Sequence, residues 1–286
     1  GLPLVPEEKR DPRYTTSYGT GEMIADALRR GFRDISIAIG GSSTNDGGIG
    51  CIRALGGKFL DENNQELNGC GEDLMKIRKI DLSGLDPFIK ECKFTVMCDV
   101  TNPLCGKDGA TYTFGRQKGA TPEIQNDLEA GMCNYRDIIK EQFDLDMDNI
   151  PGSGAAGGLG TALMVFLNGT LKSGIETVLD LVDFDEHLKD VDIVVTGEGA
   201  TDWQSVFGKV MQGVGVHCKK RHIPAVAIVG SMGSGAEDIF DYGIESIITN
   251  VNNIMPLSDA LNHAEELYLG AARRMFRLLK AGMQMR

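Results

Sequence analysis

One stretch decides the fold: Asp34-Ile35-Ser36-Ile37-Ala38-Ile39-Gly40-Gly41-Ser42-Ser43-Thr44-Asn45-Asp46-Gly47-Gly48. Its isoleucine-rich beginning predicts a buried strand. The apolar segment 49–55 predicts a helix that Gly56 ends. A strand, a glycine-rich loop and a helix together point backbone N–H groups and a helix N-terminus at an anion. A single loop of this kind is also compatible with a tight turn that is rich in glycine for local reasons.

The same design recurs along the chain, which favours the anion-binding interpretation. A second strand is predicted over 93–98 and is followed by Asp99 and two further polar residues. From about residue 174, helices and strands alternate: helices over 175–181, 206–218, 236–241 and 257–279, and strands over 191–195, 225–229 and 246–249. Such alternation predicts a parallel sheet flanked by helices, with the loops after the strands at one edge.

We therefore predict an α/β fold with two lobes. Residues 1–173 form a mixed α/β lobe with glycine-rich anion-binding loops, in which helices are expected over 21–30, 121–143 and 161–167. Residues 1–19 are expected to run along the surface. Residues 174–286 form a Rossmann-like lobe with a parallel sheet.

Composition excludes several classes of function. The net charge of −12 over 286 residues argues against nucleic acid as a partner, because a phosphate backbone requires a basic surface. The seven cysteines are scattered without a C-x-x-C pair, which argues against a disulfide or metal framework and indicates a reducing cytoplasm. No apolar run is long enough to span a membrane. The expected oligomeric state is a monomer or a homodimer.

The strand ends carry the groups that phosphoryl transfer requires. Glycine-rich loops suit the phosphates of ATP, and carboxylates suit Mg²⁺, so Asp46 and Glu198 are predicted metal ligands. Asp202 is the predicted acceptor of the substrate's hydroxyl proton, and Lys209 supplies a positive charge at the same edge. The residues assigned to the nucleotide are Gly40, Gly41, Ser42, Ser43, Thr44, Asn45, Gly47, Gly154, Gly157, Gly197 and Gly199.

Two further groups are candidates for substrate binding. Asp99, Thr101 and Asn102 follow the strand over 93–98, where an Asx turn that caps the strand is the alternative. Arg116 and Lys118 form a basic patch in an acidic protein, where a solvated loop is the alternative.

A G-x-G-x-x-G pattern occurs at Gly152, Gly154 and Gly157. It suggests an NAD-dependent dehydrogenase only weakly, because no convincing strand precedes it. A glycine-faced helix packed closely on another element and a helix N-terminus that receives an anion are the other interpretations. No P-loop and no protein-kinase signature occur in the sequence.

Five segments carry a resemblance to a known family: 37–48, 98–104, 114–122, 151–160 and 196–199. They occur in family order and spacing over essentially the whole chain, which resembles the class I glycerate kinases. The resemblance implies a two-lobed protein with its site in the cleft between the lobes. It also implies ATP- and Mg²⁺-dependent phosphorylation of D-glycerate to phosphoglycerate, with 2-phosphoglycerate favoured over 3-phosphoglycerate.

The chain departs from the family pattern in two ways. The family's N-terminal segment, with its opening strand, is not found before Gly1, so we expect the family's first strand to be missing. Ala200 stands where the family usually has an arginine, a planar charge suited to phosphate or carboxylate. These departures leave open an alternative, a truncated or non-catalytic homologue that binds nucleotide or a small hydroxy acid without turnover.

Overall fold

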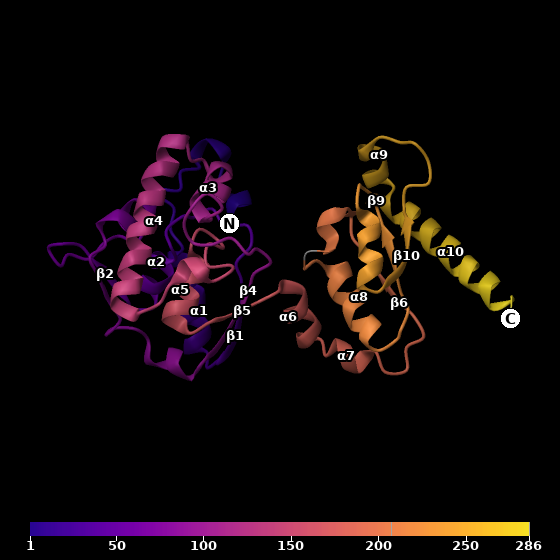
Figure 1. Cartoon of the computed structure of the whole chain (residues 1–286), viewed down its shortest axis with the longest axis horizontal. Coiled ribbons are helices and arrows are strands. Elements are labelled where there is room, and N and C mark those ends of the chain that lie inside the picture. The colour runs from indigo at the N-terminus through magenta and orange to yellow at the C-terminus, as the bar shows by residue number, and fades with distance from the viewer. Residues whose placement is uncertain (207, 286) are drawn as a thin grey trace. The chain divides into compact units, whose positions relative to one another are not determined.

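The computed structural model describes residues 1–206 and 208–285 and contains two compact units (Figure 1). Unit 1 comprises Gly1–Lys172 and unit 2 comprises Ser173–Arg286. The sequence predicts this division one position later, after residue 173. Each unit contains a parallel three-stranded sheet with helices against it, so the predicted α/β class is confirmed.

Unit 1 contains a helical part and two small sheets (Figure 1). Its helices are α1 (Tyr18–Arg29), α2 (Ile49–Ala54), α3 (Ala110–Phe114), α4 (Pro122–Phe143) and α5 (Leu159–Leu167). Its strands are β1 (Asp34–Ala38), β2 (Lys58–Leu60), β3 (Lys79–Asp81), β4 (Lys93–Met97) and β5 (Thr170–Lys172). The main sheet has the order β1-β4-β5 with both pairs parallel, and β2 pairs antiparallel with β3.

The longest helix of unit 1, α4, shows how the sequence pattern creates the core. Leu128, Met132, Tyr135 and Ile139 lie at helical spacing, and each is at most 2% exposed. Thr121 caps the helix, because its Oγ1 accepts a hydrogen bond from the N–H of Ile124 at 3.3 Å. This buried stripe fixes the face that α4 turns toward the rest of the unit.

Unit 2 has helices on both faces of its sheet. Its helices are α6 (Gly174–Leu181), α7 (Phe184–His187), α8 (Val210–Lys220), α9 (Leu257–Asn262) and α10 (Ala264–Met283). Its strands are β6 (Val194–Thr196), β7 (Ala200–Thr201), β8 (Ala225–Val229), β9 (Ser231–Met232) and β10 (Ile244–Thr249). The main sheet has the strand order β10-β8-β6, and both of its strand pairs are parallel. The strands β7 and β9, which follow β6 and β8 in the chain, form a separate parallel pair.

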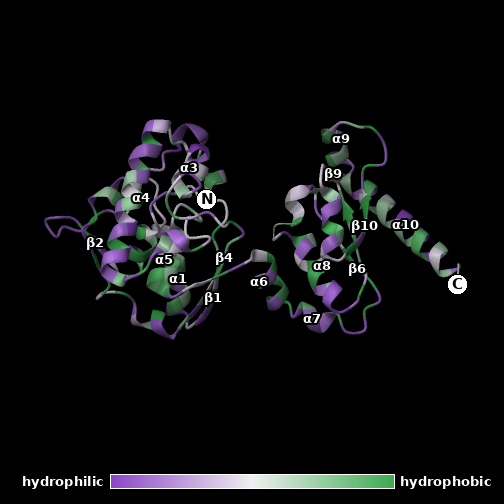
Figure 2. Cartoon of the chain, in the orientation of Figure 1, coloured by the Kyte–Doolittle hydropathy of each residue, from purple (hydrophilic) through white to green (hydrophobic). Residues whose placement is uncertain are grey.

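The central strand β8 is buried along its whole length and separates two layers of the core. Ala225, Ala227 and Val229 pack with Met211, Val214 and Cys218 of α8, whereas Val226 and Ile228 pack with Ala271 and Met275 of α10. Figure 2 shows the corresponding pattern, with apolar strands and a helix α8 that alternates between apolar and polar surface. The alternation of side chains along a strand therefore supplies both faces of the sheet.

Several element boundaries differ from those predicted. The helix predicted over 257–279 is two helices, because His263 leaves the helical region with φ −107° and ψ 20°. The strand predicted over 191–195 is Val194–Thr196, since its ladder to β8 begins only at Val194. The segment predicted as a helix over 236–241 is a 3-10 helix over Ala236–Tyr242. The short strands β3 and β5 have no counterpart in the prediction.

Among the described residues, no helix combines the length and the apolar character that crossing a membrane requires.

Candidate functional site

The loop after β1 is held in place by a buried carboxylate. Asp46 is fully buried, and its carboxylate accepts hydrogen bonds from the N–H and Oγ of Ser17, both at 2.7 Å. It also accepts the N–H of Gly48 at 3.2 Å. Burial raises the pKa of Asp46, and these donated hydrogen bonds oppose that shift. The arrangement gives Asp46 a role in shaping the loop and does not favour its predicted role as a metal ligand.

A buried lysine holds the same loop from another side. Lys118 is 2% exposed, and its Nζ donates to the carbonyl oxygen of Thr44 at 2.6 Å. Burial lowers the pKa of Lys118 to about 8, and the charge of Asp46 acts in the opposite direction. Lys118 is therefore not part of a solvated basic patch, whereas Arg116, two residues earlier, is exposed.

The glycine-rich segment before α5 completes this packing. A Cβ added at Gly157 would lie 2.1 Å from the carbonyl oxygen of Thr44, and one at Gly154 would lie 2.1 Å from that of Pro103. The N–H of Gly47 donates to the carbonyl of Gly157 at 2.9 Å. These glycines allow backbone to approach backbone, which supports the packing interpretation of the G-x-G-x-x-G pattern. Nucleotide binding by Gly154 and Gly157 stays a prediction.

A hollow of about 430 Å³ lies between the loop after β1 and the beginning of α1. Predicted residues Gly40, Gly41, Ser42, Ser43 and Thr44 line it. The opposite wall comprises Thr16, Ser17 and Thr20 at the N-terminal end of the 12-residue helix α1. The hydroxyl protons of Thr16 and Ser17 are donated to the carbonyl of Gly69 and to Asp46, so the hydroxyl groups of Thr20, Ser42 and Ser43 are the ones suited to an anion.

Three residues of that wall were missed in the sequence. Ser17 donates its Oγ to Asp46 and accepts the N–H of Cys51 at 3.0 Å, so it joins α1, α2 and the loop. The sequence predicts a surface segment for residues 1–19, because they are rich in proline and charge. The available signal was the run Thr15-Thr16-Ser17 immediately before a helical apolar pattern, which is typical of a capping position.

The loop after β4 carries the other predicted substrate residues of unit 1. The Nδ2 of Asn102 donates to the carbonyl of Asp108 at 2.7 Å, and the main-chain carbonyl of Asn102 accepts the N–H of Gly154 at 3.0 Å. Asp99 and Thr101 lie on the exposed part of the same loop. Asn102 therefore braces the loop, while Asp99 and Thr101 are accessible.

In unit 2 the predicted residues follow β6. Glu198 is half-buried, and its Oε1 accepts the N–H of Met211 at 3.3 Å, in the first turn of α8. Asp202 is half-buried, and its N–H donates to the Oγ of Ser205 at 3.2 Å. Lys209 is the exposed residue before α8. Gly197 and Gly199 are exposed, and the short pair β7–β9 places the segments after β6 and β8 side by side.

The four carboxylates are divided between the units. Asp46 and Asp99 belong to unit 1, and Glu198 and Asp202 belong to unit 2. The expectation that the four share one site stays a prediction. Carboxylate oxygens are the ligands that Mg²⁺ prefers, and among these four Asp99, Glu198 and Asp202 are reached by solvent.

Comparison with known proteins gives one consistent result. The sequence model of the glycerate kinase family matches residues 1–280. A glycerate 2-kinase of Escherichia coli is 45% identical over 284 residues, which cover 99% of this chain and 74% of that protein. A glycerate kinase of Bacillus subtilis is 41% identical over 285 residues, which cover 100% of this chain and 75% of that protein. The crystal structure of a putative glycerate kinase 2 from Salmonella typhimurium superimposes with a TM-score of 0.87 at 42% identity. The superposition covers 99% of this chain and 74% of that protein.

Proposed function

Because this chain belongs to the glycerate kinase family, we propose that it transfers the γ-phosphate of ATP to the 2-hydroxyl group of D-glycerate, with Mg²⁺ as cofactor. The observation that carries the proposal is the match along nearly the whole chain, supported by a relative named for the 2-position. The non-catalytic alternative is not favoured, since several relatives at 41–45% identity are named glycerate kinases.

The hollow of unit 1 is proposed to receive phosphate oxygens. The hydroxyl groups of Thr20, Ser42 and Ser43 in its lining support this role, because such donors can hydrogen-bond phosphate oxygens without a local cation. Asp46 and Lys118 are proposed to position this wall from beneath. Asp99, Thr101 and Arg116 are proposed to contact glycerate, since their exposure leaves them accessible.

The carboxylates of unit 2 are proposed to serve the metal ion and the proton. Glu198 is a hard oxygen donor held at the first turn of α8, so its chemistry fits Mg²⁺, which would neutralise phosphate charge when bound. Asp202 is proposed to accept the proton of the reacting hydroxyl group as the hydroxyl oxygen bonds to the γ-phosphorus. The bond from the γ-phosphorus to the bridging oxygen breaks, and ADP leaves. Lys209 is proposed to offset negative charge on the transferred group.

Product analysis tests the activity and its position. The chain is incubated with ATP, Mg²⁺ and D-glycerate, and the product is identified by phosphorus NMR. We expect 2-phosphoglycerate, and formation of 3-phosphoglycerate would refute the proposed position. Binding of ATP or glycerate in a calorimeter without any product would instead support the non-catalytic alternative.

Substitution of Asp202 tests the proposed base. Asp202→Asn is expected to lower kcat by about 10²–10⁴-fold, the usual contribution of a general base, while the circular dichroism spectrum stays unchanged. The matched control is Asp192→Asn, which removes an exposed acid just before β6 and is expected to keep the wild-type rate. An unchanged kcat in Asp202→Asn would remove Asp202 from this role.

We also propose a reducing, cytoplasmic location. All seven cysteines are free thiols, which supports this location.

A further inference from the structure

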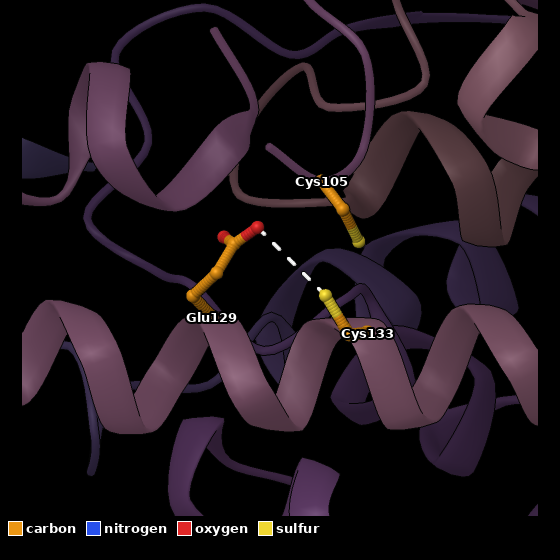
Figure 3. Close-up of side chains that lie close together, drawn as sticks. All are labelled: Cys105, Glu129 and Cys133. Carbon is orange, nitrogen blue, oxygen red and sulfur yellow. Dashed lines mark hydrogen bonds between the residues drawn. The ribbon is translucent and has the colours of Figure 1, made fainter. Parts of the chain in front are cut away.

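A cysteine of the loop after β4 meets a glutamate and a second cysteine of the distant helix α4 (Figure 3). Glu129 and Cys133 lie four residues apart on α4, and therefore on one face of that helix. Cys105 comes from the loop before α3. One ligand atom from each residue lies within 4.8 Å of the other two.

The glutamate of this cluster has a hydrogen-bonding capacity that the protein does not use. Glu129 is 8% exposed, and its Oε1 accepts the N–H of Gly106 at 2.6 Å and the thiol of Cys133 at 3.9 Å. Its Oε2 is buried without any hydrogen-bond partner. An unpartnered buried carboxylate oxygen is costly, so this atom requires a further partner to be stable.

We propose that Cys105, Glu129 and Cys133 bind a thiophilic divalent cation, with Zn²⁺ as its natural occupant. Two sulfur ligands and one carboxylate oxygen are a donor set that Zn²⁺ favours, and they leave a fourth tetrahedral position for water. The Oε1 of Glu129 faces the thiol of Cys133, so the carboxylate is already directed at the cluster (Figure 3). Cys133 is only half-buried, which gives the ion a path from solvent.

The surroundings of the cluster suit a metal complex. Binding displaces the thiol protons of Cys105 and Cys133 into solvent, and the two thiolates and the carboxylate together exceed the charge of the ion. Arg136, one turn beyond Cys133 on α4, places a positive charge near that thiol, and it also pairs with Asp137 and Asp148, each at 2.8 Å. Asp148 also accepts the N–H of Cys105 at 3.3 Å, so the cysteine is already held at the cluster.

A second cysteine–carboxylate group in unit 1 shows what a satisfied cluster looks like. Cys70, Glu72 and Asp73 also lie close together, but the oxygens of Asp73 accept hydrogen bonds from Lys76 Nζ and from the N–H of Gly69, each at 3.0 Å. Asp73 thus has internal partners, whereas Glu129 Oε2 has none. Cys70 therefore provides the matched control for a thiol that is not expected to bind the ion.

Metal titration of the metal-free chain tests the proposal. Zn²⁺ is titrated in competition with a chromophoric chelator, and Cd²⁺ is titrated while the ultraviolet charge-transfer absorption of its thiolate bonds is recorded. We expect a single tight site. Cys105→Ser, Cys133→Ser and Glu129→Gln should each weaken binding by about 10-fold or more, since even outer partners of metal sites contribute that much.

The control and the decisive variant complete the experiment. Cys70→Ser is expected to keep wild-type affinity and absorption. Absence of binding by the unmodified chain would overturn the proposal, as would binding that Cys70→Ser weakens as much as Cys105→Ser. Should a cysteine variant lose its fold by circular dichroism, the near-isosteric Glu129→Gln decides, and unchanged affinity there refutes the site.

Discussion

The two units present their glycine-rich loops in opposite ways. In unit 1 the loop after β1 is buried from Thr44 to Gly48 and is braced by Lys118 and Gly157. In unit 2 the segment after β6 leaves Gly197, Gly199 and Lys209 exposed. A loop with so many internal contacts has its shape before a ligand arrives, whereas exposed side chains stay available to reactants. The comparison predicts that substitutions damage stability in the buried part of the unit 1 loop and turnover in the exposed segment of unit 2.

The largest effect is expected where backbone approaches backbone. In Gly157→Ala the new Cβ would meet the carbonyl oxygen of Thr44 at 2.1 Å, at a φ of +69°. Overpacking and the left-handed backbone together should lower the free energy of unfolding by about 4 kcal/mol in urea denaturation. Gly199→Ala is the control in unit 2, because a Cβ there has no atom within 4 Å. Equal losses in both variants would contradict the comparison.

Removal of the buried carboxylate is expected to have the next largest effect. Asp46→Asn replaces an acceptor of three hydrogen bonds by a group with one oxygen, and it leaves Lys118 buried without an opposing charge. The expected cost is about 3 kcal/mol in the free energy of unfolding. Thermal and urea denaturation measure it. Asp202→Asn in unit 2 should lower kcat with little change in stability. A loss of stability in Asp202→Asn and none in Asp46→Asn would contradict the comparison.

The smallest effect concerns the pH dependence of stability. Because burial lowers the pKa of Lys118 to about 8, the unfolded chain holds this proton more tightly than the folded chain. The resulting cost is present in full below the folded pKa and fades as the pH rises toward the unfolded value. Between about pH 8 and pH 10, the free energy of unfolding of the wild-type chain should rise by about 2 kcal/mol relative to that of Lys118→Met.

The control for this titration is Lys209→Met, which removes an exposed ammonium group of unit 2. Comparison with this variant separates the contribution of Lys118 from the loss of a lysine charge in general. A flat difference for Lys118→Met would show that the ammonium group of Lys118 is hydrated in solution.

The sequence allowed the parallel strands to be predicted because their physics is local. Five apolar residues in a row predict a strand over Ala225–Val229, and the structure confirms these bounds and shows the strand buried at the centre of its sheet. The cap at Thr121 and the proline after it likewise predict the start of α4. Short edge strands such as β5, with three residues, carry too little pattern to be recognised.

The site was predicted less completely, because side-chain environment depends on distant contacts. Lys118 looks like part of a basic loop in the sequence, and only the position of Thr44 explains its burial. In the sequence Asp46 resembles an available metal ligand, whereas in the structure its carboxylate accepts a hydrogen bond from the Oγ of Ser17. Spacing likewise argues against a cysteine metal site, since Cys105 and Cys133 are brought together only by the fold.

The hydrogen bond from the N–H of Gly47 to the carbonyl of Gly157 has a consequence for the order in which the protein folds during synthesis. The loop after β1 is translated first, and its last brace, Gly157, is translated roughly a hundred residues later. A nascent chain that stops before α5 therefore lacks the support that shapes this loop. The loop therefore reaches its final shape only when nearly all of unit 1 has emerged.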